Sequence, residues 1–186
     1  MRIFAAIDLA ERARSELAAL ITTFRRHGAN VQWVETSRLH LTLRFFGEID
    51  EPARAEIQNQ LRKAAEQTRK FQMRLAGLSG FPNLKRPTVL WVGVDEGKAM
   101  LESLAATINS ACPGGDKEAQ RFHPHVTLGR VDNAERLDAL IGEMKWMTFS
   151  SAHRFDVDHL SLYRSVLGGK QPVYEAVAKF AFTGAS

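Results

Sequence analysis

Two short stretches of the sequence carry side chains that could do chemistry, and both have the same pattern. "HLTLRFF" begins at His40 and "HVTLGRV" begins at His125, so each reads histidine, apolar residue, threonine, leucine. The second stretch follows the first by 85 residues, close to half of the 186-residue chain. Two copies placed in this way are much harder to assign to chance packing than one.

Each motif lies in a run of alternating apolar residues, which predicts a β-strand. Residues i and i+2 of a strand point to the same face, so His40 projects with Thr42, and His125 projects with Thr127. If the two halves of the chain face each other, two imidazoles and two hydroxyls line one cleft. The spacing therefore predicts one shared site.

Those four side chains suit phosphoryl chemistry without a metal. Imidazole has an ordinary pKa of about 6.5, so near neutral pH one histidine can accept a proton while the other donates one. Each of these proton transfers contributes roughly 10²–10⁴-fold to a rate. Threonine hydroxyls can donate hydrogen bonds to the oxygens of an anion held between the imidazoles.

A metal site is an alternative use of the same residues. His123 and His125 are two imidazoles at strand spacing, and His40 could be a third ligand. However, no acidic or cysteine ligand accompanies either motif, and Pro124 disturbs regular strand geometry. We therefore expect neither a metal nor another cofactor.

The other histidines and the one cysteine stand outside these motifs. We expect surface or structural roles for His27, His153 and His159. Cys112 lies in "SACPGG", which looks like a helix end running into a turn, so a catalytic thiol is not expected. A single cysteine cannot form an internal disulfide, which fits a reducing compartment such as the cytoplasm.

Strands and helices interleave irregularly along the chain, which predicts an α+β fold with mostly antiparallel sheet. Strands are expected at 2–9, 31–34, 39–47, 71–78, 88–94, 125–131, 155–165 and 172–182, the last two joined by a turn at Gly168-Gly169. Amphipathic helices are expected at about 11–28, 50–70, 97–111 and 134–143. Each half thus holds one His-x-Thr strand, which favours a duplicated architecture.

Length and composition bound the class of protein. With 45% hydrophobic and 25% charged residues and no linker-like stretch, we expect one domain over residues 1–186. No apolar run is long enough to span a bilayer, and the N-terminus reads as a first strand, not a signal peptide. The net charge of +4 indicates a polyanionic partner only mildly.

The pair "HLTLRF" and "HVTLGR" resembles the extended motifs His-x-Thr-x-x-Phe and His-x-Thr-x-x-Arg of two-histidine phosphoesterases. Within that superfamily the chain looks like the RNA 2′,3′-cyclic phosphodiesterases, also named 2′-5′ RNA ligases. The resemblance runs from "RIFAAIDL" through "FPNLKRPTVLWVGV" to the "LSLYRS" ending. It implies a bilobal pseudo-twofold fold, with helices packed outside mostly antiparallel sheets and a central cleft that carries both motifs.

The resemblance also implies a role for each motif residue. His40 matches the general acid that protonates the ribose O3′ leaving group, and His125 matches the general base that activates water. The residues that match substrate contacts are Thr42 and Thr127 for the phosphate, Arg130 as a phosphate clamp, and Phe45 as the ring that stacks on the terminal base.

Strict alternation leaves one difficulty with this assignment. Phe45 and Arg130 each lie five residues past their histidine, which is the opposite face of a regular strand. They reach the site only if the strand ends, twists or bulges, which Gly47 and Gly129 allow. Alternation alone selects Phe46, so the sequence leaves open which phenylalanine faces the cleft.

The prediction is therefore an enzyme that hydrolyses a 2′,3′-cyclic phosphate at an RNA terminus to a 2′-phosphate, as a monomer that is not bound to a membrane. The same acid–base pair could join or cleave 2′-5′ linked RNA reversibly, or open a small cyclic nucleotide. From a different class, a basic domain with an exposed aromatic could bind RNA without turnover, but binding alone gives no reason for the matched motifs. The natural RNA and any base preference stay open.

Overall fold

The structure is a computed structural model, and it describes residues 1–112, 122–166 and 172–183. The helices are α1 (Glu11–Arg25), the short 3₁₀ helix η1 (Thr36–Arg38), α2 (Glu51–Glu66), α3 (Lys98–Ala111) and α4 (Leu137–Trp146). The strands are β1 (Arg2–Asp8), β2 (Val31–Trp33), β3 (His40–Glu48), β4 (Phe71–Phe81), β5 (Val89–Glu96), β6 (His125–Val131), β7 (Phe155–Val157), β8 (His159–Val166) and β9 (Val173–Ala181).

These elements follow the order that the sequence predicts, with one correction. The strand expected over 155–165 is two strands, β7 and β8, which separate at Asp158. The two pair at opposite ends of the sheet, since β7 lies beside β4 whereas β8 lies between β1 and β9. The apolar positions shift by one residue here, from Phe155 and Val157 to Leu160 and Leu162, but this shift does not reveal which strand each segment pairs with. The turn expected at 168–169 lies outside the described residues.

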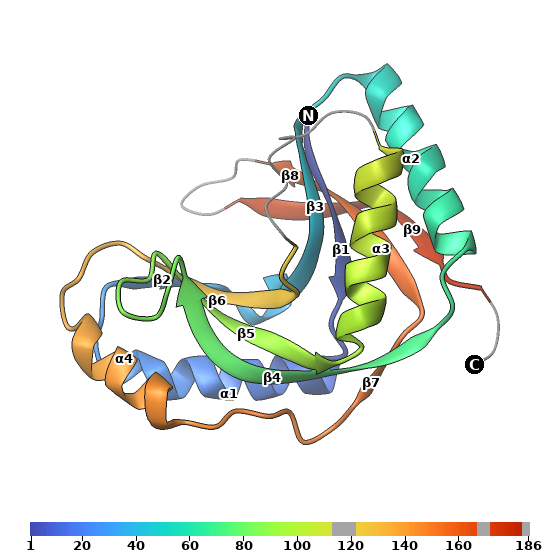
Figure 1. The fold of residues 1–186 in the computed structure, drawn as a ribbon. Helices are drawn as coiled ribbons and strands as arrows, with labels where there is room; N and C mark the ends of the chain where they lie inside the picture. The colour runs from blue at the N-terminus through green and yellow to red at the C-terminus, as the bar shows by residue number, and fades with distance from the viewer. Residues whose placement is uncertain (113–121, 167–171, 184–186) are drawn as a thin grey trace.

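The strands form one strongly curved sheet in the order β7-β4-β5-β6-β3-β1-β8-β9, with β2 added beside β6 (Figure 1). Every pair of named strands in the described residues is antiparallel. Four strands of this path lie on each side of the β6–β3 junction. Because β1-α1-β3 and β5-α3-β6 repeat the same strand, helix, antiparallel strand order, the two halves are related by a pseudo-twofold axis. The predicted bilobal α+β fold is confirmed.

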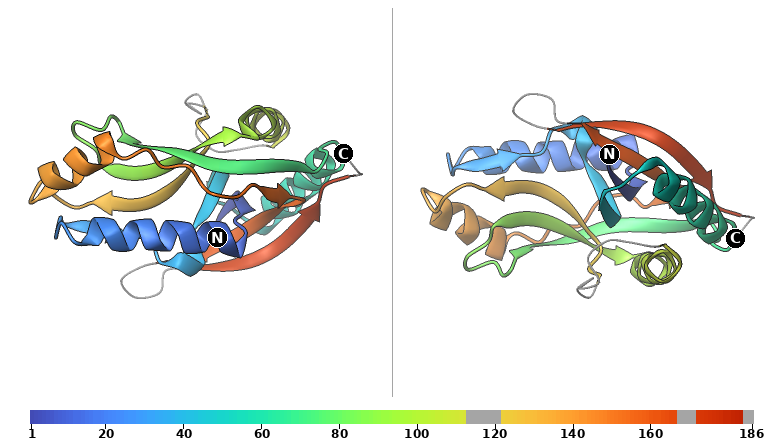
Figure 2. Two further views of the ribbon diagram at one scale, coloured as in Figure 1. Left: turned by 90° about the horizontal axis from the view of Figure 1, so that it is seen from below. Right: turned by 90° about the horizontal axis from the view of Figure 1, so that it is seen from above.

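The helices cover the outside of the two halves. α2 and α3 lie together against the half that contains β3, while α1 and α4 lie along the half that contains β4 (Figures 1 and 2). The stripe of α1 that the spacing predicts is buried, and its members are Leu17, Leu20, Ile21 and Phe24. None of the helices in the described part of the chain combines the length and hydropathy that a transmembrane span requires.

Arg44 ties the end of α3 to β3. Its guanidinium Nη1 donates to the carbonyl oxygens of Ile108 at 3.0 Å, Asn109 at 3.3 Å and Cys112 at 3.2 Å. These carbonyls lie at a helix C-terminus, where few backbone donors remain, and that of Ile108 also accepts from the backbone N–H of Cys112. Through these hydrogen bonds Arg44 holds α3, the helix that follows β5, against the strand that carries the first motif.

Cys112 lies at the end of the same helix. Burial raises the pKa of the Cys112 thiol to about 11, so at neutral pH this thiol is protonated and a poor nucleophile.

Within the described residues, the two halves of the sheet meet at a single residue pair. Leu41 of β3 stands opposite Val126 of β6, and both side chains are fully buried in the core. Each is the apolar residue between the histidine and threonine of its motif. The packing of this pair therefore determines how the two motifs are placed relative to each other.

We expect Leu41→Ala to lower the free energy of unfolding by about 2–5 kcal/mol, because it removes buried apolar atoms and leaves a cavity. Urea unfolding followed by circular dichroism measures the change. Val173→Ala on β9, where the side chain is 52% exposed, should change it by less than about 0.5 kcal/mol. Equal losses in the two variants would contradict a tightly packed junction.

Candidate active site

The register at the junction brings the two motifs together on one face of the sheet. With Leu41 opposite Val126, one further step in each direction sets each histidine opposite the threonine of the other motif. These pairs are His40 with Thr127 and Thr42 with His125. All four side chains are half-buried on the face opposite the junction pair, and we call this surface the motif face. The pseudo-twofold axis passes through the junction pair.

Both motif strands carry a β-bulge at the same position. The register skips Leu43 where β3 pairs with β1, and it skips Leu128 where β6 pairs with β5. Each skipped leucine stands three residues after its histidine. One extra residue reverses the alternation of side chains, so Phe45 and Arg130 return to the face of their histidines.

The bulge decides between the two adjacent phenylalanines. Phe45 is 61% exposed, and its ring centre lies 5.4 Å from that of Phe4, which in turn lies 5.0 Å from the His40 ring. Phe46 is only 4% exposed and packs in the core beneath the guanidinium of Arg44, 5.0 Å from its ring centre. Strict alternation, which selected Phe46, is therefore wrong here, because the bulge shifts the pattern by one.

On the second motif, a close approach of backbones accompanies the bulge. Trp33 of β2 pairs with Gly129, and a Cβ at Gly129 would stand 2.6 Å from a methyl carbon of Val31 and 3.1 Å from the Trp33 ring. A larger residue would require the Val31 side chain or β2 itself to move, so glycine suits this position. The next residue, Arg130, is exposed, and its positive charge lowers the pKa of His125.

The two imidazoles are held in the same way. The Nδ1 atom of His40 lies 2.7 Å from the carbonyl oxygen of Arg38, and that of His125 lies 2.7 Å from the carbonyl oxygen of His123. A carbonyl oxygen only accepts hydrogen bonds, so Nδ1 carries the hydrogen and donates it in both rings. This leaves Nε2 as the atom that exchanges protons. In the first motif Nε2 lies 3.0 Å from the Thr42 hydroxyl.

Burial lowers the pKa of both histidines below the ordinary value of 6.5. For His40 this effect is opposed by the hydrogen bond to its carbonyl partner and by the negative charge of Asp8. For His125 it is opposed by the hydrogen bond to its own carbonyl partner, whereas the charges of His123 and Arg130 lower the pKa further. The charges around the two imidazoles thus differ, although the backbone geometry is the same.

Aromatic rings surround each imidazole. The rings of Phe4 and Tyr174 lie 5.0 Å and 5.3 Å from that of His40, and the ring of Phe81 lies 4.9 Å from that of His125. A cavity of about 690 Å³ opens beside the first motif. Its lining includes Asp8, Arg38, His40, Tyr163 and Tyr174.

These surrounding residues were not identified from the sequence, although a signal was present. In "RIFAAIDL" the carboxylate of Asp8 interrupts an apolar strand, and in "HLSLY" the polar residues His159, Ser161 and Tyr163 alternate with leucines. Such alternation predicts one polar face on β8. His159, which was expected to have a surface or structural role, donates to Asp8, and His27 contacts Glu143.

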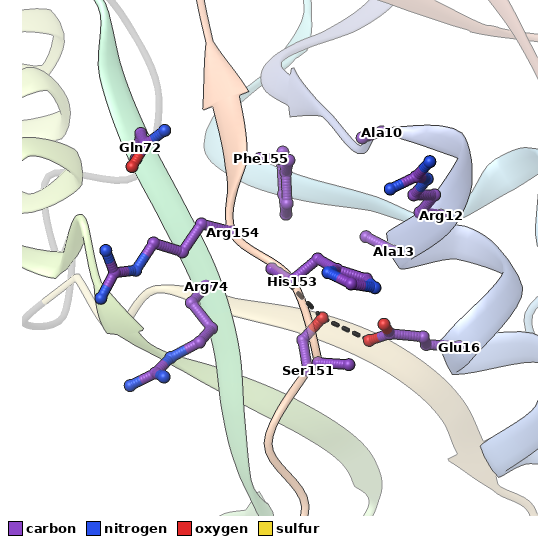
Figure 3. A pocket seen from close by; sticks show the side chains of 11 residues that line it. Ala10, Arg12, Ala13, Glu16, Gln72, Arg74, Ser151, His153, Arg154 and Phe155 are labelled. Carbon is purple, nitrogen blue, oxygen red and sulfur yellow. Dashed lines mark hydrogen bonds between the residues drawn. The ribbon is translucent and has the colours of Figure 1, made fainter.

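A second hollow, of about 480 Å³, lies between the start of α1, β4 and the segment before β7 (Figure 3). Its polar groups engage one another, since the Ser151 hydroxyl donates to Glu16, while Arg74 and Arg154 point away from α1 and pair with acidic residues of β5. His153 also lies there. None of the described residues that line this hollow belongs to either motif, so the motif face is the better candidate site.

No three histidine, cysteine, aspartate or glutamate side chains are placed to hold a metal ion within residues 1–112, 122–166 and 172–183. Among these described residues, His40, His123 and His125 do not form such a group either. The motif face consists of two imidazoles and two hydroxyls, with the exposed Arg130 further along the second motif strand.

The fold and the motif pair define the class of two-histidine phosphoesterases. The chain belongs to the 2′-5′ RNA ligase superfamily, because the family model of that description matches residues 13–169. Among relatives, an Aeropyrum pernix protein named RNA 2′,3′-cyclic phosphodiesterase is 35% identical over 163 residues, which cover 87% of this chain and 92% of the relative. A protein of the same name from Aquifex aeolicus is 31% identical over 95% of this chain and 91% of the relative.

Solved structures share this fold. The structure of TT0787 from Thermus thermophilus superimposes with a TM-score of 0.81 at 29% identity, over 100% of both chains. Escherichia coli LigT, solved in complex with phosphate, superimposes with a TM-score of 0.78 at 23% identity, over 98% of both chains, and shows likeness of fold alone.

Because of the bulge in β3, we expect substitutions of Phe45 and Phe46 to differ in their effect on the free energy of unfolding. Phe46→Ala should lower the free energy of unfolding by about 3–5 kcal/mol, because it removes a buried ring. Phe45→Ala should lower it far less, because that ring is 61% exposed. Urea denaturation of the two variants measures both values, and a larger loss for Phe45→Ala would show that the register of β3 is wrong.

Proposed function

We propose that this protein hydrolyses the 2′,3′-cyclic phosphate at an RNA terminus to a 2′-phosphate. The observation that carries the proposal is the register of β3 and β6, which sets each histidine opposite the threonine of the other motif around one point. A phosphate above that point is within reach of an imidazole from each side. This arrangement suits an attack and a departure on opposite sides of phosphorus.

In the proposed reaction His125 is the general base and His40 is the general acid. Nε2 of His125 accepts a proton from water while the water oxygen forms a bond to phosphorus. The bond between phosphorus and O3′ breaks, and Nε2 of His40 donates its proton to O3′. The product carries a 2′-phosphate and a 3′-hydroxyl, and one further proton exchange with water restores both imidazoles. Neither proton transfer calls for a metal.

The remaining motif residues hold the substrate. Thr42 and Thr127 can donate hydrogen bonds to the non-bridging phosphate oxygens, and the Arg130 guanidinium can form paired hydrogen bonds with them. These contacts stabilise the charge that develops as the ring opens. The exposed ring of Phe45 can stack on the terminal base, which contributes about 1–3 kcal/mol and tolerates any base.

The names of the relatives support this choice of substrate. Relatives that cover most of this chain are named RNA 2′,3′-cyclic phosphodiesterase, and this substrate fits the moderate positive charge of the chain. The superfamily description names a ligase, and the same acid–base pair run in reverse would join a hydroxyl to the phosphate in a 2′-5′ linkage. We propose that the protein acts as a hydrolase, and that it is a monomer in the cytoplasm. Separation of 2′-phosphate from 3′-phosphate products tests which of the two ring bonds to phosphorus breaks.

Substitution of either histidine should abolish most of the activity. We expect His40→Ala and His125→Ala each to reduce kcat/KM by about 10²–10⁴-fold on an oligoribonucleotide that ends in a cyclic phosphate. His153→Ala, which lies in the second hollow, should retain the wild-type rate. EDTA should leave wild-type turnover unchanged. Full activity in either motif variant would refute the acid–base mechanism, and loss of activity in EDTA would support a metal-dependent one.

The pH profile of kcat/KM should be bell-shaped, with its maximum below about pH 6.5. The general acid is active only while protonated, and burial lowers the pKa of both imidazoles. Above the pKa of His40, the general acid, the rate should fall by about tenfold per pH unit. At low pH, protonation of His125, the general base, should reduce the rate. Steady-state rates measured at several pH values test this, and a constant rate from about pH 5 to 8 would contradict it.

A further inference from the structure

The two motifs differ in the residue that stands beside each histidine on the neighbouring strand. Asp8 of β1 is the partner of His40, whereas Gly93 of β5 is the partner of His125. Partners in an antiparallel pair share a face and have Cα atoms about 4.5–5.5 Å apart. The carboxylate of Asp8 therefore lies on the motif face next to His40, and both residues line the same cavity.

The second motif has no room for an equivalent side chain. A Cβ at Gly93 would stand 2.9 Å from the carbonyl oxygen of Ala76 and 3.3 Å from the ring of Trp91. Of the described residues, the charged groups that act on His125 are His123 and Arg130, and both are cationic when charged. The pseudo-twofold axis thus relates two identical motifs whose electrostatic surroundings are different.

Side chains of β8 and β9 hold Asp8 in place. Ser161 Oγ donates to Asp8 Oδ2 at 2.7 Å, Tyr163 OH donates to Oδ1 at 2.5 Å, and His159 Nε2 donates to Oδ2 at 2.9 Å. Lys179 Nζ lies 3.5 Å from the same carboxylate. Burial by itself raises the pKa of Asp8, but these donors lower it well below its ordinary value, so the group stays ionised.

We propose that Asp8 is a positioning residue that makes His40, and not His125, the imidazole that carries the proton before reaction. It acts through His40 and does not itself touch the substrate. The proposal rests on the acid–base function proposed above, because only that function requires the two histidines to differ.

The other charged groups near His40 do not supply this preference. Arg38 of η1 and His125 of β6 lower the pKa of His40, and the Arg38 guanidinium stacks 4.9 Å from the Tyr174 ring centre of β9. Arg14 of α1, Glu35 before η1, and Tyr163 of β8 also line the cavity. Among all of these groups, Asp8 is the acid whose charge favours the protonated form of His40.

Asp8→Asn removes the charge while it keeps the shape of the side chain. NMR titration of the imidazole signals should show that wild-type His40 titrates at a higher pH than His125. In Asp8→Asn the titration of His40 should move to lower pH, and that of His125 should stay in place. The alkaline limb of kcat/KM should shift with it, so that the rate at about pH 7.5 falls by about tenfold.

Two control variants separate charge from structure. Asp156→Asn makes the same change on β7 and should leave both imidazole titrations unchanged. Tyr163→Phe removes one donor to Asp8 but leaves its carboxylate, so it should reduce thermal stability and leave the pH profile in place. If Asp8→Asn does not fold, Asp8→Ser removes the charge with a smaller polar side chain and is titrated in the same way.

The outcomes distinguish this inference from the proposed function. A His40 titration that does not move when the charge of Asp8 is removed, or a wild-type His125 that titrates above His40, would overturn the role of Asp8 even if hydrolysis is confirmed. An absence of hydrolysis would instead refute the proposed function, and the NMR titrations would still report on Asp8.

Discussion

The contact between Leu41 and Val126 is the constraint on which the rest of the site depends. In the described part of the chain it is the one paired position between β3 and β6, and both side chains are fully buried. Because antiparallel register alternates faces, burying this pair on one side obliges both histidines and both threonines to emerge on the other. A slip of one residue would turn one motif into the core and destroy the shared site. Burial of this pair in the core therefore also determines the geometry of the site.

The paired β-bulges extend this symmetry beyond the four motif residues. Each adds one residue at the leucine three positions after the histidine, Leu43 or Leu128. The symmetry of backbone does not extend to the side chains, because the bulges bring an exposed ring, Phe45, to one end of the face and a guanidinium, Arg130, to the other. An aromatic ring suits a base and a guanidinium suits a phosphate, so in the proposed function the two bulges place different contacts for the two ends of the substrate.

The surroundings of the histidines complete that asymmetry. Both imidazoles donate Nδ1–H to a backbone carbonyl two residues earlier, so their tautomers and orientations match. They differ in the neighbouring strand, where β1 supplies the ionised Asp8 and β5 supplies Gly93. A duplicated scaffold can in this way provide two similar side chains for opposite proton transfers, because the difference resides in a residue outside either motif.

The motif positions, the α+β class and most elements follow from the amino-acid sequence alone. The apolar periods of two residues in a strand and 3.6 residues in a helix are local properties of the chain. The same periodicity places His40 with Thr42 on one face, and His125 with Thr127. Three outcomes required the folded chain: Phe45 and not Phe46 faces the site, residues 155–165 divide between two ends of the sheet, and Asp8 stands beside His40. Those outcomes depend on which strands become neighbours and where the register slips, and both are set by contacts between residues far apart in the chain.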